Sequence, residues 1–160
     1  MKLGKLGVWA SLEGYSAQES VDIARRVEEL GFSALWQPEA MGRNVLTHSS
    51  WILAHTNTLI AATGIANIYA RDPMSMRSAQ MTLNEQSGGR FLLGMGVSHA
   101  PLVSGLRGHA YGKPVATMRD YIAKMKAAMY VAPPPPEPPL TVIAALGPKM
   151  LALAAEQCVV

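Results

Sequence analysis

The 160-residue sequence is short of cysteine, of charge and of long hydrophobic runs, and each shortage excludes a class of protein. The single cysteine, Cys158, excludes a disulfide within the chain and is typical of a reducing compartment, so we expect a cytoplasmic protein. The apolar patch near the amino terminus is too brief for a secretion signal or a membrane span. These shortages leave burial of aliphatic side chains as the main force that stabilises the fold.

Charged residues make up only 16% of the chain, and their pattern argues against a nucleic-acid partner. The net charge is +3, and the lysines and arginines are scattered instead of forming a basic stripe. Hydrophobic residues make up 49% of the chain, and its length suffices for one sizeable core. We therefore expect a single domain over residues 1–160.

Several common catalytic and binding motifs are missing. The run Gly94–His99 has two glycines of a dinucleotide fingerprint, but the third is absent and no helix follows at once. There is no Walker loop, and the histidines lack the spacing of zinc ligands. Ser98 does not lie in a nucleophile elbow and has no acid placed to complete a triad, which argues against a hydrolase.

The sequence does contain a regular alternation of strand and helix signals. Ser16 and Glu19 form a capping box, Asp72-Pro73 is typical of a helix start, and Gly88 of a helix end. Strands are expected at residues 6–10, 33–37, 59–69, 90–96 and 140–144, with helices after residue 16, at 48–58, at 73–86, after residue 114 and at 149–156. This order predicts an α/β protein whose mainly parallel sheet is covered by helices.

Two architectures fit this order: a doubly wound open sheet, or part of a (β/α)₈ barrel of the TIM type. A full barrel needs about 250 residues, so this chain would hold about five of its eight units. Residues 132–139 are nearly all proline and are expected to form an extended connector before the fifth strand. Residues 97–113 are expected to form a long loop, of the kind that is usually functional or mobile.

Ligands bind at the carboxyl ends of parallel strands, and candidate polar residues follow two of the predicted strands. Glu39 comes just after the second strand, where it is either a solvated loop carboxylate or a polar group at the mouth of the sheet. His99 follows the fourth strand. Methionines at helical spacing are more simply read as core filler than as a flavin site, and these are Met74, Met81, Met118, Met125 and Met129.

Several short segments, taken together and in order, resemble the bacterial luciferase-like monooxygenase superfamily. The resemblance is greatest to the actinobacterial branch that uses the deazaflavin coenzyme F-420. The segments are Leu6-Gly-Val-Trp9, Val27-Glu-Glu-Leu-Gly-Phe32, Leu35-Trp-Gln-Pro-Glu39, Ala62-Thr-Gly-Ile-Ala-Asn-Ile-Tyr69, Arg71-Asp-Pro73, Gly89-Arg-Phe-Leu-Leu-Gly-Met-Gly96 and Ala144-Ala-Leu-Gly-Pro148.

The resemblance implies a (β/α)₈ barrel with a flavin or deazaflavin at the carboxyl ends of its strands. In such enzymes the third strand carries a bulge, often with a non-prolyl cis peptide, against which the ring rests. The residues that match the bulge and the surrounding mouth are Gly64, Ile65, Ala66, Asn67, Trp9, Glu39, Gly96, Ser98 and His99. The implied chemistry is hydride transfer at F-420, or oxygen activation if the cofactor is reduced FMN, acting on a small organic substrate. Glu39 and His99 are the catalytic candidates.

The chain departs from this family by stopping at residue 160, where a sixth strand should begin. Phosphate sites in barrels often follow strands seven and eight, so part of the cofactor site is expected to be missing and activity to be weak or absent. The first and fifth strands would be open edges, which predicts a homo-oligomer. A non-catalytic, truncated flavoprotein-like homodimer is therefore an alternative to an oxidoreductase.

Overall fold

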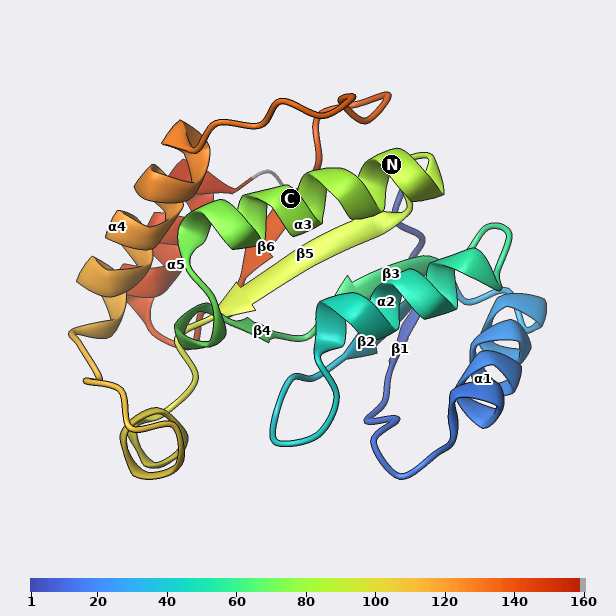
Figure 1. Cartoon of the computed structure of the whole chain (residues 1–160), viewed down its shortest axis with the longest axis horizontal. Helices are drawn as coiled ribbons and strands as arrows, with labels where there is room; N and C mark the ends of the chain where they lie inside the picture. Colours follow the sequence, from blue (N-terminus) through green and yellow to red (C-terminus); the bar gives the residue numbers. More distant parts are fainter. Residues whose placement is uncertain (159–160) are drawn as a thin grey trace.

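The computed structural model describes residues 1–158, and strands and helices alternate along this whole length (Figure 1). The strands are β1 (Gly7–Trp9), β2 (Ala34–Gln37), β3 (Ile60–Thr63), β4 (Ala66–Asn67), β5 (Phe91–Gly96) and β6 (Thr141–Ile143). The α-helices are α1 (Ala17–Glu29), α2 (Val45–Ala54), α3 (Pro73–Ser87), α4 (Pro114–Ala127) and α5 (Pro148–Gln157). None of these helices is long and apolar enough to cross a membrane.

All strand pairs in the sheet are parallel. The order across the sheet is β1, β2, β3, β5 and β6, and the short β4 resumes the pairing with β5 that β3 begins. In the register Ala34 pairs with Ile60, and Ala62 pairs with Leu92. The predicted parallel (β/α) order is therefore correct.

Alternate residues along the strands face two different environments. Leu35, Phe91 and Leu93 belong to the large cluster that the helices cover. Ala34, Ile60, Ala62 and Leu92 face the other way, into a small cluster that contains no helical residue among those described. Helices on one face only are typical of a barrel and rule out the doubly wound alternative.

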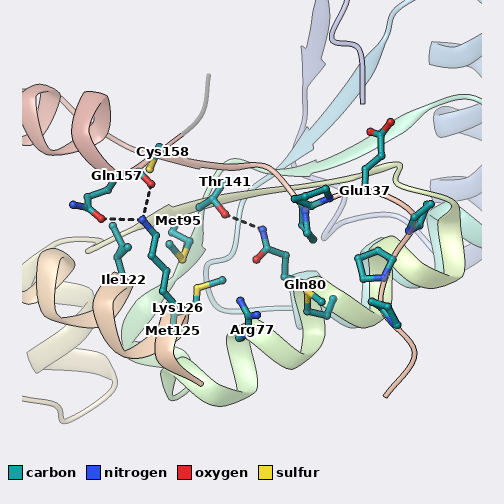
Figure 2. A pocket seen from close by; sticks show the side chains of 16 residues that line it. Arg77, Gln80, Met95, Ile122, Met125, Lys126, Glu137, Thr141, Gln157 and Cys158 are labelled. Atoms are coloured by element: carbon teal, nitrogen blue, oxygen red, sulfur yellow. Dashed lines mark hydrogen bonds between the residues drawn. The ribbon is translucent and has the colours of Figure 1, made fainter. Parts of the chain in front are cut away.

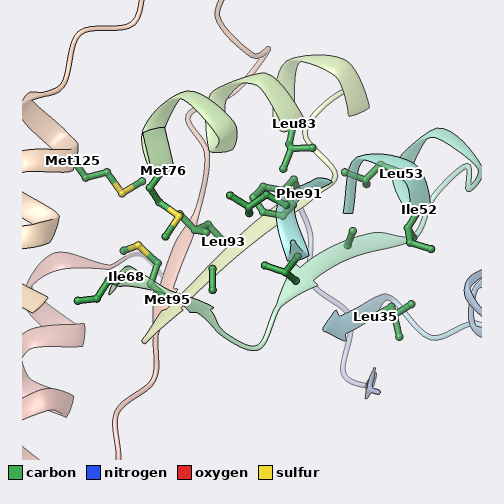
Figure 3. Packing of buried hydrophobic residues seen from close by; sticks show 14 of the residues in the cluster. Leu35, Ile52, Leu53, Ile68, Met76, Leu83, Phe91, Leu93, Met95 and Met125 are labelled. Carbon is green, nitrogen blue, oxygen red and sulfur yellow. The ribbon is translucent and has the colours of Figure 1, made fainter. Parts of the chain in front are cut away.

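The helix-covered face forms the main core (Figure 3). Phe91, Leu93 and Met76 are fully buried there, where α3 packs on β5. Met118 and Met125 are also buried, as predicted, but Met74 and Met129 are 55% and 74% exposed, so the prediction that they fill the core was wrong. Met76, not Met74, turns toward the sheet.

Local signals fixed most helix starts. Both hydrogen bonds of the Ser16 capping box are present, and Asp72 caps α3 ahead of Pro73. The second helix was predicted three residues late, because the Asn44 side chain accepts hydrogen bonds from two main-chain N–H groups and starts α2 at Val45.

The predicted single strand over residues 59–69 was wrong. It is interrupted by a cis peptide bond between Gly64 and Ile65, which separates β3 from β4, and residues Ile68–Ala70 form a 3-10 turn. The long loop contains a π-helical turn at Pro101–Leu106. Residues 128–140, which include the proline-rich connector, form neither helix nor strand.

Candidate active site at the strand ends

The cis peptide bond lies in the bulge that the resemblance implies, and strands β1 and β2 hold it by hydrogen bonds. The Trp9 indole N–H donates to the carbonyl oxygen of Gly64 at 2.9 Å. The main-chain N–H of Gly64 donates to Gln37 at 2.8 Å, and that of Glu39 donates to the carbonyl oxygen of Ile65 at 3.1 Å. The bulge is thus fixed by its neighbours in the sheet.

A buried carboxylate holds the far side of the bulge. One oxygen of Glu39 accepts a hydrogen bond from the main-chain N–H of Asn67 at 2.8 Å, and the other forms an ion pair with Arg71. The Glu39 and Arg71 side chains are only 5% and 10% exposed. Because both oxygens of Glu39 have partners, this carboxylate positions the bulge.

Two glycines of β5 make room for the bulge. A Cβ atom on Gly94 would lie 2.0 Å from the carbonyl oxygen of Thr63, and one on Gly96 would lie 2.8 Å from the side chain of Ile65. The Thr63 hydroxyl also joins the two strands, since it accepts from the N–H of Gly94 at 2.9 Å and donates to its carbonyl at 2.8 Å. No larger side chain fits at Gly94 without moving the backbone of β3.

Beside the bulge lies a cavity of about 730 Å³, here called the strand-end cavity. Its lining comes from the bulge, from the segments that follow β5 and β6, and from the first residues of α4 and α5. The lining residues are Ile65, Gly96, Val97, Ser98, His99, Pro114, Val115, Ala144, Leu146, Gly147, Pro148, Lys149 and Met150.

The helix starts give this cavity a positive end. Helices α4 and α5 both begin with proline, and within residues 1–158 neither has a side-chain cap, unlike α1, α2 and α3. Pro114 and Pro148 have no N–H, and the N–H group of Met150 donates to the carbonyl of Gly147 at 3.0 Å. The N–H groups of the second helical residues, Val115 and Lys149, remain for an anionic group, and the Lys149 side chain adds a positive charge in the first turn of α5.

The rim of the cavity carries the polar residues Ser98 and His99. Ser98 has a positive φ of 54°, a backbone conformation that residues other than glycine rarely adopt. Its carbonyl oxygen accepts a hydrogen bond from the Tyr111 hydroxyl at 3.1 Å. Tyr111 stacks on Tyr69 at 5.7 Å between ring centroids, and burial raises the pKa of Tyr111. His99 is exposed at the rim.

The predicted site residues fall into three groups. The first group lines the strand-end cavity and consists of Ile65, Gly96, Ser98 and His99. The second group does not line the cavity: it consists of Trp9, its partner Gly64, and the fully buried bulge residues Ala66 and Asn67. Glu39 lines a different cavity, of about 500 Å³, with Arg43, Arg71 and Arg107. The structure therefore does not bring the two catalytic candidates, Glu39 and His99, into one cavity.

Sequence reasoning missed the cavity wall made by α4 and α5, and it missed the role of Arg71. The wall had a signal, because Lys113-Pro114 and Gly147-Pro148 start helices without a Ser, Thr, Asp or Asn cap. No local sequence signal indicated the role of Arg71, because its partner Glu39 lies 32 positions earlier in the chain. Among residues 1–158, no group of three His, Cys, Asp or Glu side chains is arranged to hold a metal ion.

Comparison with known proteins identifies relatives over most of the chain. Residues 2–160 match the luciferase-like monooxygenase family. A Mycobacterium tuberculosis protein assigned as a coenzyme F-420-dependent oxidoreductase is 34% identical over 123 residues, which are 76% of this chain and 35% of that protein. The 5,10-methylenetetrahydromethanopterin reductase of Archaeoglobus fulgidus is 31% identical over 147 residues, covering 81% of this chain and 44% of the enzyme.

Solved structures show the same fold. The F-420-dependent tetrahydromethanopterin reductase of Methanopyrus kandleri superposes with a TM-score of 0.78 at 17% identity, over 98% of this chain and 55% of that one. An F-420-dependent secondary alcohol dehydrogenase, solved with an F-420–acetone adduct, gives 0.81 at 17% identity, over 98% and 57%. The chain thus spans about half the length of these structures and about a third of its Mycobacterium tuberculosis relative. Because the family match extends over residues 2–160, the chain belongs to the luciferase-like monooxygenase family.

Proposed function

We propose that the strand-end cavity binds the deazaflavin coenzyme F-420, with FMN as the alternative, for oxidoreduction of a small organic substrate. The observation that carries the proposal is the composition of the cavity wall: Ile65 from the bulge on one side, and the uncapped starts of α4 and α5 on the other. A volume of about 730 Å³ lies within the ordinary range for cofactor and ligand sites.

The residues present fit such a cofactor. Ile65, Val97 and Val115 would contact an apolar ring. Gly96 leaves room for Ile65, since a Cβ atom there would lie 2.8 Å from the Ile65 side chain. The main-chain N–H and the side-chain charge of Lys149, at the start of α5, would hold anionic groups of the cofactor.

The bound cofactor would supply hydride transfer, and the protein would supply orientation and electrostatics. Trp9 and Glu39 keep the bulge in place through the contacts described above. His99, exposed at the rim, is the candidate for donating or accepting the proton that accompanies hydride transfer. The Mycobacterium tuberculosis relative assigned as F-420-dependent supports this cofactor over FMN.

Titration with oxidised F-420, reduced F-420 and FMN, followed by fluorescence, tests the proposal. We expect saturable binding of F-420, weakened by Lys149→Gln and unchanged by Lys124→Gln, an exposed lysine of α4 that does not line the cavity. The proposal fails if neither cofactor binds.

A homodimer is a second proposal, favoured by the edges of the sheet. Within residues 1–158, β1 and β6 each have a partner strand on one side only. The β1 edge also exposes apolar surface, since Leu6 is 68% and Trp9 62% exposed. Pairing of these edges between two copies would bury that surface. Light scattering that shows only a monomer at micromolar concentration would contradict this proposal.

A further inference from the structure

A third cavity, of about 510 Å³, lies between α3, α4 and the proline-rich connector (Figure 2). We call it the connector cavity. Its lining residues are Arg77, Gln80, Met81, Met95, Ile122, Met125, Lys126, Pro134–Pro139, Thr141, Gln157 and Cys158, and none of them lines the strand-end cavity. A ligand here would therefore be independent of the cofactor proposed above.

Most of the wall of the connector cavity is apolar. The side chains of Met81, Met95, Ile122 and Met125 come from α3, β5 and α4, and the prolines close the opposite side. Methionine side chains are flexible and polarisable, so such a wall adapts to an aliphatic chain more readily than to a ligand of fixed shape.

The charges in this cavity are unbalanced. Arg77 forms no ion pair within residues 1–158, and its Nε is buried without a hydrogen-bond partner. Lys126 donates to the carbonyl and side-chain oxygens of Gln157, at 3.2 and 2.9 Å, both of which are neutral. Glu137, the one carboxylate in the lining, lies at the far end from Lys126 in Figure 2 and pairs with the amino group of Met1 at 2.7 Å.

Arg77 lines the cavity and has no counter-charge among residues 1–158, and an anionic head group in the cavity would supply one. Arginine binds carboxylates through paired, charge-assisted hydrogen bonds. We propose that the connector cavity binds an aliphatic carboxylate, with its head group at Arg77 and its chain along the methionines and prolines. The charge balance of the lining excludes a cationic ligand, and the apolar wall disfavours a small inorganic anion.

Cys158 provides a direct readout, because it lines the cavity and is the single cysteine of the sequence. We expect decanoate to slow the alkylation of Cys158 by iodoacetamide several-fold and saturably, in the full chain at mildly alkaline pH. Decanol and decyltrimethylammonium, which carry the same chain without the negative charge, are expected to give little protection. This comparison needs no variant.

Arg77→Gln tests the head-group site. The variant is expected to fold normally, since Arg77 has no partner to lose, and to weaken decanoate binding about tenfold or more. Lys124→Gln is the matched control, because it removes an exposed cation of α4 that lies outside the cavity. F-420 and FMN titrations of Arg77→Gln should match the unaltered chain, which separates this proposal from the cofactor site.

Three results would overturn the proposal. The first is an absence of protection by decanoate, and the second is equal protection by decanol, which would indicate a purely apolar surface. The third is unchanged decanoate affinity in Arg77→Gln, which would place the carboxylate elsewhere.

Discussion

The two sides of the strand-end cavity satisfy their main-chain polar groups in opposite ways. On the bulge side, the carbonyls of Gly64 and Ile65 and the N–H of Asn67 all have partners, supplied by Trp9 and Glu39. On the helix side, α4 and α5 start without a side-chain cap in the part of the chain that the structure describes.

This difference distinguishes the groups that stabilise the bulge from the groups that would bind an anionic ligand. A segment whose main-chain groups are held by such hydrogen bonds is rigid, so changes there should cost stability. Open N–H groups at a helix start are already solvated, so changes there should cost little stability and should act on an anionic ligand instead. Substitutions on each side therefore test this difference.

The largest effect is expected for Glu39→Ala. Removing one partner of a buried ion pair costs about 3–5 kcal/mol, because Arg71 is left buried without its counter-charge and the N–H of Asn67 loses its acceptor. Urea unfolding measures the change. The control is Glu29→Ala, which breaks an exposed pair with Arg26 and should cost about 0.5 kcal/mol or less. Equal losses in the two variants would show that the bulge is not held by Glu39.

The next largest effect is expected for Gly94→Ala, which should lower the free energy of unfolding by about 2–3 kcal/mol through overpacking. The added methyl group would meet the carbonyl oxygen of Thr63 at 2.0 Å, and a main-chain atom cannot move aside as a flexible side chain would. The matched control is Gly14→Ala, where no atom lies within 4 Å of the new Cβ. A wild-type unfolding midpoint for Gly94→Ala would contradict the close approach of β3 and β5.

Trp9→Phe should cost about 1 kcal/mol, the ordinary value of one hydrogen bond, because the carbonyl of Gly64 loses its indole donor. Trp51→Phe serves as the control, since that indole donates to Ala17 far from the bulge and should cost a similar amount. The two variants should differ in cofactor titrations, where only Trp9→Phe is expected to weaken binding. Equal cofactor affinities would show that the bulge keeps its shape without Trp9.

The smallest effect on stability is expected for Lys149→Gln, which lies on the helix side. We expect a change in unfolding free energy within about 0.5 kcal/mol, as for surface substitutions generally. Affinity for F-420 should fall about threefold at low ionic strength, and the difference should shrink as salt is added. Thermal unfolding and fluorescence titration give the two quantities. A loss of stability like that of Gly94→Ala would remove the distinction between the two sides.

Much of the fold could be predicted because its signals are local. The capping box at Ser16, the Asp72-Pro73 start of α3 and the alternating strands each depend on a few neighbouring residues. The start of α2 was predicted too late, because the cap at Asn44 was not recognised ahead of a weakly periodic helix. The break in the third strand could be placed only through the family resemblance, because nothing in the residues themselves distinguishes a cis peptide at Gly64 from a continuous strand.

The site was less predictable because its contacts join distant segments. The ion pair of Glu39 with Arg71 and the hydrogen bond of Trp9 to Gly64 span 32 and 55 positions of the sequence. The resemblance named Trp9 and Glu39 as mouth residues, and only the packed sheet shows that they contact the bulge. The cavity wall from α4 and α5 likewise depends on where two helices begin in space.

The proline-rich connector has a consequence for conformational entropy. Six of the seven residues 133–139 are proline, and each proline restricts the unfolded chain by roughly 0.5–1 kcal/mol of conformational free energy. The wall that they form around the connector cavity is therefore largely ordered before any ligand arrives. A ligand held against it would lose less affinity to the ordering of protein segments than one held by a flexible loop.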